Sequence, residues 1–233
     1  MARDRKALSE LGVSHYRFGI EWARVEPEPG QLNLDVLAQY AARAEALKAV
    51  GIEPIVCLWH FTFPDWATDL DNPDQNGWLH PQTQARWSAY VTAVVDALGP
   101  HVQIWAPQNE PNAQAMAGYF MGMWPPGVEG DLSAVAAQTT AAAEHFSEAA
   151  HILRQRDDDA QILTIQNIIA FEGQAWDALG VFTRIGDQYN YAHLDAVHEE
   201  ADLIGFNYYY RRGASPFPTH EEMWPKGIRW AIV

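Results

Sequence analysis

The chain has 233 residues, of which 48% are hydrophobic, and it carries a formal net charge of −15 with only three lysines. Such a chain can bury one sizeable core. Its acidity excludes nucleic acid and anionic lipid as expected partners, because both would be repelled. The acidity is accounted for by ordinary solubility, with adaptation to high salt as the alternative.

The cysteine count and the distribution of apolar residues bear on the compartment. One cysteine, Cys57, lies in an apolar run and is expected in the core, so no disulfide can form within one chain. No apolar stretch reaches the length of a membrane span, and no signal peptide follows Met1. These features predict a cytoplasmic protein without a membrane partner.

Short apolar runs that predict strands alternate with amphipathic patterns that predict helices. The predicted strands comprise residues 15–20, 53–58, 101–105, 160–165 and 201–206. The predicted helices comprise one that ends before Gly12 and then residues 35–50, 81–98, 132–156 and 189–199. Buried strands joined by helices are typical of a parallel α/β sheet.

Each predicted strand ends in polar or aromatic residues that an apolar core would not select. In chain order these are Arg17, Glu21 and Trp22, then Trp59 and His60, then Gln108, Asn109 and Glu110, then Gln166 and Asn167, and finally Asn207, Tyr208 and Tyr209. Because the carboxyl ends of parallel strands meet at one rim, we expect a single pocket lined by these side chains. Amide, carboxylate and imidazole groups are suited to binding sugar hydroxyls.

Several of these residues also have a purely structural interpretation. Arg17 could be a paired core arginine, and His60 could be a core histidine with its hydrogen bonds satisfied. Glu21 is expected to be an ion-pair partner of Arg17 or Arg24 rather than a catalytic group. Tyr208 and Tyr209 point to opposite faces of a strand, so at most one of them faces the pocket.

Tryptophan is abundant, with ten residues in the chain. Five of them fall near the strand-end loops, where an indole could cover the apolar face of a pyranose ring: Trp22, Trp59, Trp66, Trp78 and Trp124. Trp87 falls on the apolar face of a predicted helix and is expected in the core.

The segment Asn109-Glu110-Pro111, at the end of the third predicted strand, resembles the acid/base motif of barrel glycosidases. It is followed by a glycine-tyrosine and then a proline-proline-glycine pattern at residues 118–127, which resembles the family 1 β-glycosidases specifically. Three further segments resemble that family in the same order: residues 16–25, 58–66 and 202–209. The resemblance extends over residues 12–209.

The resemblance implies a (β/α)8 barrel that is incomplete here, with about five βα units in a single partial domain over residues 1–233. It implies a retaining β-glycosidase similar to β-glucosidases, which acts on a small-molecule glycoside without a metal or a cofactor. Retaining hydrolysis uses two carboxyl groups about 5 Å apart, one as acid and one as nucleophile.

The resemblance also implies a role for each matching residue. Glu110 corresponds to the general acid/base, Arg17 lies beside the nucleophile and keeps it ionised, and Asn207 and Tyr209 support the position of the nucleophile.

The substrate-binding residues follow from the same matches. Asn109 and His60 correspond to hydroxyl-binding residues, and Trp124 is expected to contact substrate. Phe61 stands where the family usually has tryptophan, which removes one ring N–H donor from the site.

The nucleophile is expected in a Glu-Asn-Gly motif, which does not occur in these 233 residues. The matching segments correspond to strands two to six of eight. We therefore expect a truncated or split enzyme that needs a complementary chain and is inactive alone. Glu221 and Glu222 are expected to be solvated rather than substitute nucleophiles.

Two other interpretations remain open at this point. The chain could be a non-catalytic carbohydrate-binding or interaction module derived from a glycosidase. It could also be a five-stranded doubly wound sheet of the flavodoxin type, which predicts a phosphate-binding glycine loop after the first strand. The residues after Ile20 are instead tryptophan, arginine and prolines, which disfavours that fold.

Overall fold

A computed structural model of the protein describes residues 2–172 and 180–213. It has five strands: β1 (His15–Gly19), β2 (Glu53–Trp59), β3 (Ile104–Gln108), β4 (Gln161–Glu172) and β5 (Leu203–Gly213). The α-helices are α1 (Ala2–Glu10), α2 (Trp22–Val25), α3 (Leu34–Lys48), α4 (Pro81–Leu98), α5 (Pro111–Tyr119), α6 (Leu132–Arg156) and α7 (Val181–Val197). No helix among the described residues is long and apolar enough to cross a membrane.

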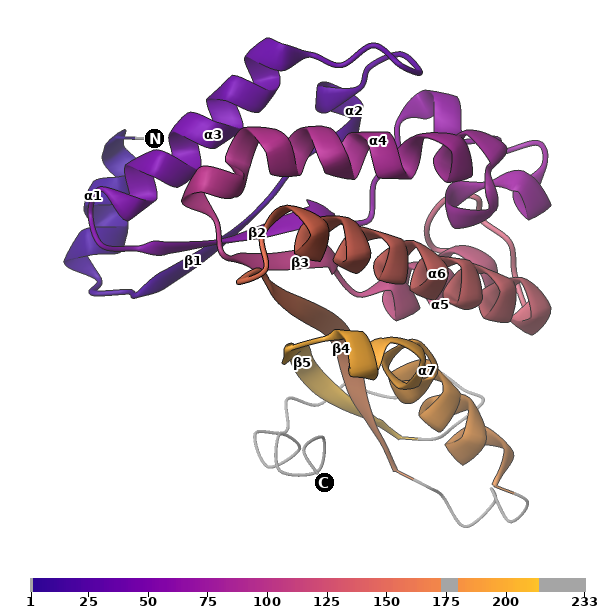
Figure 1. Ribbon diagram of the computed structural model, residues 1–233. Coiled ribbons are helices and arrows are strands. Elements are labelled where there is room, and N and C mark those ends of the chain that lie inside the picture. The colour runs from indigo at the N-terminus through magenta and orange to yellow at the C-terminus, as the bar shows by residue number, and fades with distance from the viewer. Residues whose placement is uncertain (1, 173–179, 214–233) are drawn as a thin grey trace.

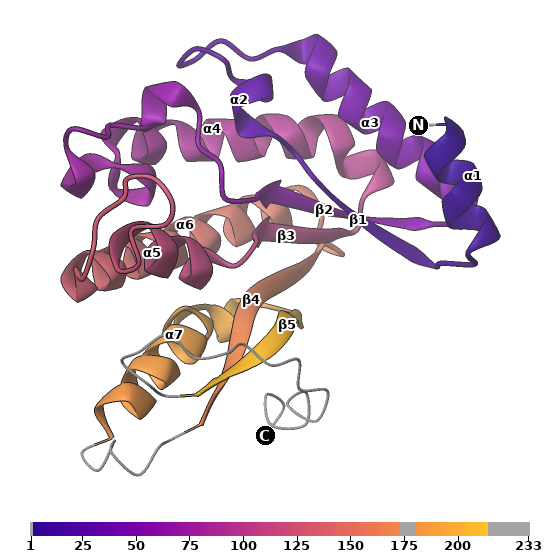
Figure 2. The same ribbon diagram turned by 180° about the vertical axis from the view of Figure 1, so that it is seen from behind.

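The five strands form one parallel sheet in the order β1-β2-β3-β4-β5, so each strand pairs with the next one in the chain. The helices α3, α4, α6 and α7 follow one another along one side of this sheet (Figures 1 and 2). This arrangement is an incomplete (β/α)8 barrel, as the sequence predicts.

Alternation along the strands divides the apolar side chains between the two faces of the sheet. Val56 and Trp105 belong to the large core beneath the helices, whereas their neighbours Cys57 and Ala106 form a small cluster with Ile165 on the other face. The helix-facing side carries the main core. The other face is that of the barrel interior, and the strand-end polar residues project from its rim.

Most of the tryptophans expected near the pocket belong to the core instead. Trp22 stacks on Tyr90 with ring centroids 4.8 Å apart, and Trp78 lies 4.8 Å from Trp59 and 5.3 Å from Trp87. Trp22, Trp59 and Trp78 are almost fully buried, so the prediction that they cover sugar rings is wrong. Aromatic side chains that large stabilise the helix–sheet interface, as Trp87 was predicted to do.

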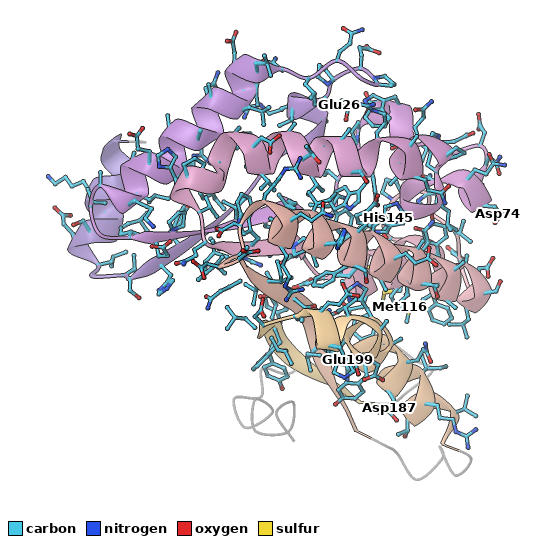
Figure 3. The ribbon with its side chains drawn as sticks, viewed as in Figure 1. Glu26, Asp74, Met116, His145, Asp187 and Glu199 are labelled. Atoms are coloured by element: carbon cyan, nitrogen blue, oxygen red, sulfur yellow. The ribbon has the colours of Figure 1, made fainter. Side chains whose placement is uncertain are left out.

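A buried carboxylate organises the loop after β1. Glu26 is fully buried and accepts hydrogen bonds from Trp22 Nε1 at 3.0 Å, from the Gly30 N–H at 2.7 Å and from Arg86 Nε at 2.6 Å. Figure 3 shows Glu26 beside α2 and close to α4. The charge is thus paired and hydrogen-bonded, as burial of a carboxylate requires.

Several predicted element boundaries were wrong; β4 and β5, for example, extend to Glu172 and Gly213, beyond the predicted ends at residues 165 and 206. The third strand spans residues 104–108 rather than 101–105, because Gly99–His101 forms a 3-10 turn and Pro107 lies inside the strand. The last predicted helix begins at Val181, eight residues before the predicted start. Helix α5 was not predicted.

A buried polar chain links the sheet to two helices. His193 of α7 lies 3.1 Å from Gln108 Oε1 through Nε2, and 2.8 Å from Gln166 Nε2 through Nδ1. Gln108 Nε2 in turn donates to the Ala142 carbonyl of α6 at 2.8 Å. Burial lowers the pKa of His193 to about 3, so the ring is neutral, donates from Nε2 and accepts at Nδ1.

This neutral histidine makes the stability of the fold depend on pH. The pKa of His193 is about 3 in the folded protein against 6.5 for an ordinary histidine. Its contribution is therefore fully present above pH 6.5 and is lost as the pH falls from 6.5 towards 3, because only the unfolded chain takes up the proton. We expect a loss of up to about 1.4 kcal/mol per pH unit in that range.

Urea denaturation at a series of pH values checks this expectation. The His193→Gln variant keeps one donor and one acceptor but cannot titrate, so its slope between pH 6 and pH 4 should be smaller than that of the wild type. His151→Gln, at an exposed position on α6, is the control and should keep the wild-type slope. Equal slopes in all three proteins would contradict the assignment.

Candidate active site

The backbone of Glu110 turns sharply where β3 ends. Its φ and ψ are 47° and 54°, the left-handed region that few residues other than glycine adopt. The Glu110 N–H still donates to the Ile165 carbonyl of β4 at 2.9 Å, and α5 starts at the next residue, Pro111. The turn thus aims the Glu110 side chain away from the line of the strand, while its main chain stays attached to the sheet.

The Glu110 carboxyl group is buried and touches polar groups from other strands. Its residue exposure is 5%. Asn207 Nδ2 donates to Glu110 Oε1, and the side chain of Asn167 also hydrogen bonds the carboxylate. Burial raises the pKa of Glu110 above its ordinary value, while the two amides and the charge of Arg17 oppose that rise. The site therefore favours a protonated carboxyl without isolating it from donors.

Arg17 fixes the neighbouring amide. Its Nη1 donates to Asn109 Oδ1 at 2.7 Å, and Asn207 Nδ2 lies 3.4 Å from the same oxygen. Because the Asn109 oxygen is occupied by these donors, its NH2 group is the part of the amide that can donate to a ligand. Arg17 is thus joined to Asn109 by a charge-assisted hydrogen bond, which differs from a core ion pair.

His60, Phe61 and Trp124 form an aromatic edge beside these polar groups. The rings of His60 and Phe61 have centroids 4.8 Å apart, as do those of Phe61 and Trp124. Phe61 has a φ of 71°, a left-handed backbone that turns its ring out of the strand direction. Burial and the charge of Arg17 lower the pKa of His60, which favours a neutral imidazole. Trp124 keeps 37% of its surface exposed.

The structure brings all eight sequence-predicted site residues to one rim of the sheet. Tyr209, which is 58% exposed, joins the set through electrostatic contact: burial and the Glu110 charge raise its pKa, and Arg17 opposes the rise. Glu21 accepts a hydrogen bond from Thr62 Oγ1 at 2.8 Å, a different partner from the predicted arginines. Whether these residues act in catalysis or binding stays a prediction.

Two amides expected at the rim point elsewhere. Gln108 and Gln166 both bond His193 of α7. Alternation explains Gln166, which shares the parity of the helix-facing Ile162, but not Gln108, which shares the parity of Ala106 on the other face. Glu221 and Glu222, which were expected to be solvated, lie outside the described residues.

Sequence reasoning gave no role to two residues that support Glu110. Asn112, in the first turn of α5, and Tyr189 of α7 are both buried and bond Asn167. A polar residue in a first helical turn carries no distinctive sequence signal, and Tyr189 fell at the edge of a predicted helix. Among the residues that the structure describes, no group of three or more His, Cys, Asp or Glu side chains could hold a metal ion.

The loop after α5, which carries Trp124, is tightly folded against the helix. A Cβ atom at Gly118 would lie 2.9 Å from the Pro125 carbonyl oxygen and 3.4 Å from Pro126 Cδ. The Val128 N–H donates to the Gly118 carbonyl at 2.9 Å. The glycine and proline residues of the pattern at residues 118–127 therefore allow the close contact between Gly118 and Pro125, which positions Trp124.

Comparison with known proteins decides the family. The family model for glycosyl hydrolase family 1 matches residues 1–174. The chain belongs to this family.

The curated relatives match this chain over only part of their own length. Coniferin beta-glucosidase from Pinus contorta is 37% identical over 124 residues, which cover 53% of this chain and 23% of the relative. Beta-glucosidase A from Acetivibrio thermocellus is 31% identical over 160 residues, which cover 68% of this chain and 34% of that protein. The match thus covers about a quarter to a third of the length of these curated relatives.

Solved structures of other proteins agree with the fold. The beta-glycosidase from Pyrococcus horikoshii superposes with a TM-score of 0.78 at 26% identity, covering 90% of this chain and 51% of that chain. Fpglu1 from Fervidobacterium pennivoraus superposes with a TM-score of 0.81 at 24% identity, covering 95% of this chain and 54% of that chain. Because each match covers at least 90% of this chain, both extend beyond residues 1–174, which the family model matches.

The close contact at Gly118 gives a stability prediction. Gly118→Ala should lower the free energy of unfolding by about 1–3 kcal/mol, because the new methyl group meets a backbone carbonyl that cannot move freely. Urea denaturation followed by tryptophan fluorescence measures the change.

The matched control is Gly99→Ala. Gly99 has a helical backbone, and the nearest atom to an added Cβ is Val95 Cγ1 at 4.0 Å. This variant should stay within about 0.5 kcal/mol of the wild type. A Gly118→Ala protein as stable as Gly99→Ala would show that the loop does not pack as described.

Proposed function

We propose that the whole protein hydrolyses β-linked glycosides with retention of configuration, in the manner of a β-glucosidase, and that Glu110 is its general acid and then its general base. The observation that carries this proposal is the buried Glu110 carboxyl group, with a raised pKa, at the end of β3. Membership of glycosyl hydrolase family 1 supports the reaction class.

The first step needs a protonated acid at the glycosidic oxygen. Burial favours the protonated form of Glu110, so it can donate its proton to the leaving group as the bond to the sugar breaks. In the second step the resulting carboxylate takes a proton from water, which attacks the glycosyl-enzyme intermediate. The Asn207 and Asn167 amides stabilise that carboxylate between the two steps.

The substrate contacts follow from the same rim. The Asn109 NH2 group, oriented by Arg17, donates to a sugar hydroxyl, and the neutral imidazole of His60 can bind another. Phe61 and Trp124, whose rings pack together, cover an apolar face of the sugar or its leaving group. These assignments make the glycoside a small molecule bound across the rim of the sheet.

Retaining hydrolysis also needs a nucleophilic carboxylate about 5 Å from the acid. The described groups that act on Glu110 are Asn207, Asn167, Arg17 and Tyr209, none of which is a carboxylate. We place the nucleophile in a part of the enzyme outside these groups, supplied by further sequence or by a complementary chain. In this proposal Arg17 lies beside the nucleophile and keeps it ionised, and Asn207 and Tyr209 support its position.

Kinetics of the Glu110→Gln variant test the acid role. In an assembly of this chain with the remaining strands of a family 1 barrel, the variant should lose about 10²- to 10⁴-fold in kcat/KM on a methyl β-glucoside, whose leaving group needs a proton. The loss should be much smaller in the bond-breaking step with a 2,4-dinitrophenyl β-glucoside, because that leaving group departs without one.

Glu144→Gln, which changes an exposed carboxylate on α6, is the matched control and should keep wild-type kinetics. Equal losses of Glu110→Gln on both substrates would contradict a general-acid role. Turnover by the 233-residue chain alone that disappears in Glu110→Gln would refute the external nucleophile. Glycoside binding without turnover in every assembly would instead favour a non-catalytic binding module.

A further inference from the structure

In the middle of β4, the edge of the strand that faces β3 is bonded by a side chain, while the other edge pairs with β5. Beyond the bridge between Asn109 and Ile165, β3 gives way to the turn at Glu110 and offers β4 no further partner. The side chain of Asn112 bonds the main chain of β4 where β3 no longer does. Its Oδ1 accepts from the Asn167 N–H at 3.2 Å, and its Nδ2 donates to the Asn167 carbonyl at 2.7 Å. The main chain of Asn167 is therefore fixed on both its polar groups.

The side chain of Asn167 is fixed separately, from α7. The Tyr189 hydroxyl donates to Asn167 Oδ1 at 2.6 Å, and Asn112 Nδ2 also reaches the Tyr189 carbonyl, at 3.0 Å. Asn112, Asn167 and Tyr189 are all buried, so water does not compete strongly for these bonds. The other end of this amide, its NH2 group, makes the contact with the Glu110 carboxylate.

A carboxamide has one acceptor end and one donor end, and an ionised carboxylate such as that of Glu110 can pair only with the donor end. With Oδ1 held by the Tyr189 hydroxyl, the NH2 group of Asn167 faces Glu110. The reverse orientation would place the amide oxygen against the oxygens of the ionised carboxylate. A tyrosine hydroxyl can also accept, so Tyr189 does not exclude that orientation, but its 2.6 Å hydrogen bond to Oδ1 stabilises the observed one.

We propose that Tyr189 is a positioning residue of the active site, which locks the Asn167 amide so that its NH2 group donates to Glu110. Tyr189 does not touch the Glu110 carboxylate itself and acts on it through Asn167. Its importance for catalysis therefore rests on the proposed role of Glu110. Helix α7, on the outer side of the sheet, would thereby set the proton affinity of a group at the rim.

The other groups that act on Glu110 define what Tyr189 adds. Arg17 approaches from β1, and Asn207 and Tyr209 approach from β5. From β4, Asn167 contributes an amide whose acceptor end is held by the Tyr189 hydroxyl. Loss of the Tyr189 hydroxyl would let the amide turn its oxygen towards Glu110, which favours the protonated carboxyl and slows its return to the base form.

Side-chain amide NMR of the 233-residue chain measures this orientation without any need for turnover. In the wild type, the NH2 protons of Asn167, assigned by their loss in Asn167→Ser, should shift with pH as Glu110 ionises, and the shift should vanish in Glu110→Gln. In Tyr189→Phe, we expect this titration of the amide protons to fall by at least half. Tyr191→Phe, which removes a hydroxyl from the same helix, is the control and should keep the full titration.

A Tyr189→Phe protein that keeps the wild-type amide titration would overturn the proposal, as would an equal loss in Tyr191→Phe.

Asn167→Asp provides a second test if Tyr189→Phe does not fold. Its carboxylate should accept from Tyr189 and repel Glu110, so the Glu110 carboxyl should titrate at higher pH than in the wild type. An unchanged Glu110 titration in that variant would show that residue 167 does not face Glu110. Because both readouts report protonation, they would stand even if Glu110 had no part in glycoside hydrolysis.

Discussion

At the end of β3, Glu110 keeps its main chain bonded to the sheet and also turns its side chain out of the strand into the rim. The Glu110 N–H remains bonded to Ile165 of β4, while the left-handed backbone turns the side chain into the rim and starts α5 at Pro111. Such a conformation costs a non-glycine residue of order 1–2 kcal/mol and persists because its surroundings determine it. The surroundings here are the sheet beneath, the helix after it, and amides from β4 and β5.

The chemistry of the site follows from a balance at that carboxyl group. Burial alone would keep Glu110 protonated, which suits an acid but would hinder the later return of the proton. Two amide donors and the nearby Arg17 oppose burial and stabilise the ionised form. A group that has to be an acid in one step and a base in the next needs both influences, since its pKa has to lie near the working pH. The neutral His60 beside it adds a hydroxyl-binding group without adding charge.

The sequence predicted the alternating parallel architecture because buried β-branched runs and amphipathic helices have different periods. Helices α4 and α6 were predicted with their observed bounds, since both combine clear periodicity with recognisable ends. Strand β3 begins three residues later than predicted, because Gly99–His101 forms a 3-10 turn before it. Helix α5 was not predicted, because its nine residues are buried on most sides and show no amphipathic pattern.

The same contrast holds for the site. Arg17, Asn109, Glu110 and Asn207 were predicted because they follow buried strands and match a family motif. Their mutual hydrogen bonds could not be predicted, since alternation decides the face of each residue but not its partners. The supporting pair of Asn112 and Tyr189 lies on helices, where a polar residue is ordinary. Burial of Trp22, Trp59 and Trp78 is a tertiary property that strand-end position does not reveal.

The measurement that tests this account most directly is the pH titration of the Glu110 carboxyl group in the wild-type chain, by carbon-13 NMR with labelled glutamate. The signal is assigned by its absence in Glu110→Gln. The account predicts a midpoint above the ordinary value of 4.5, because burial outweighs the amides and Arg17. A midpoint at or below 4.5 would mean that the site holds Glu110 as a permanent carboxylate, which contradicts its role as the acid.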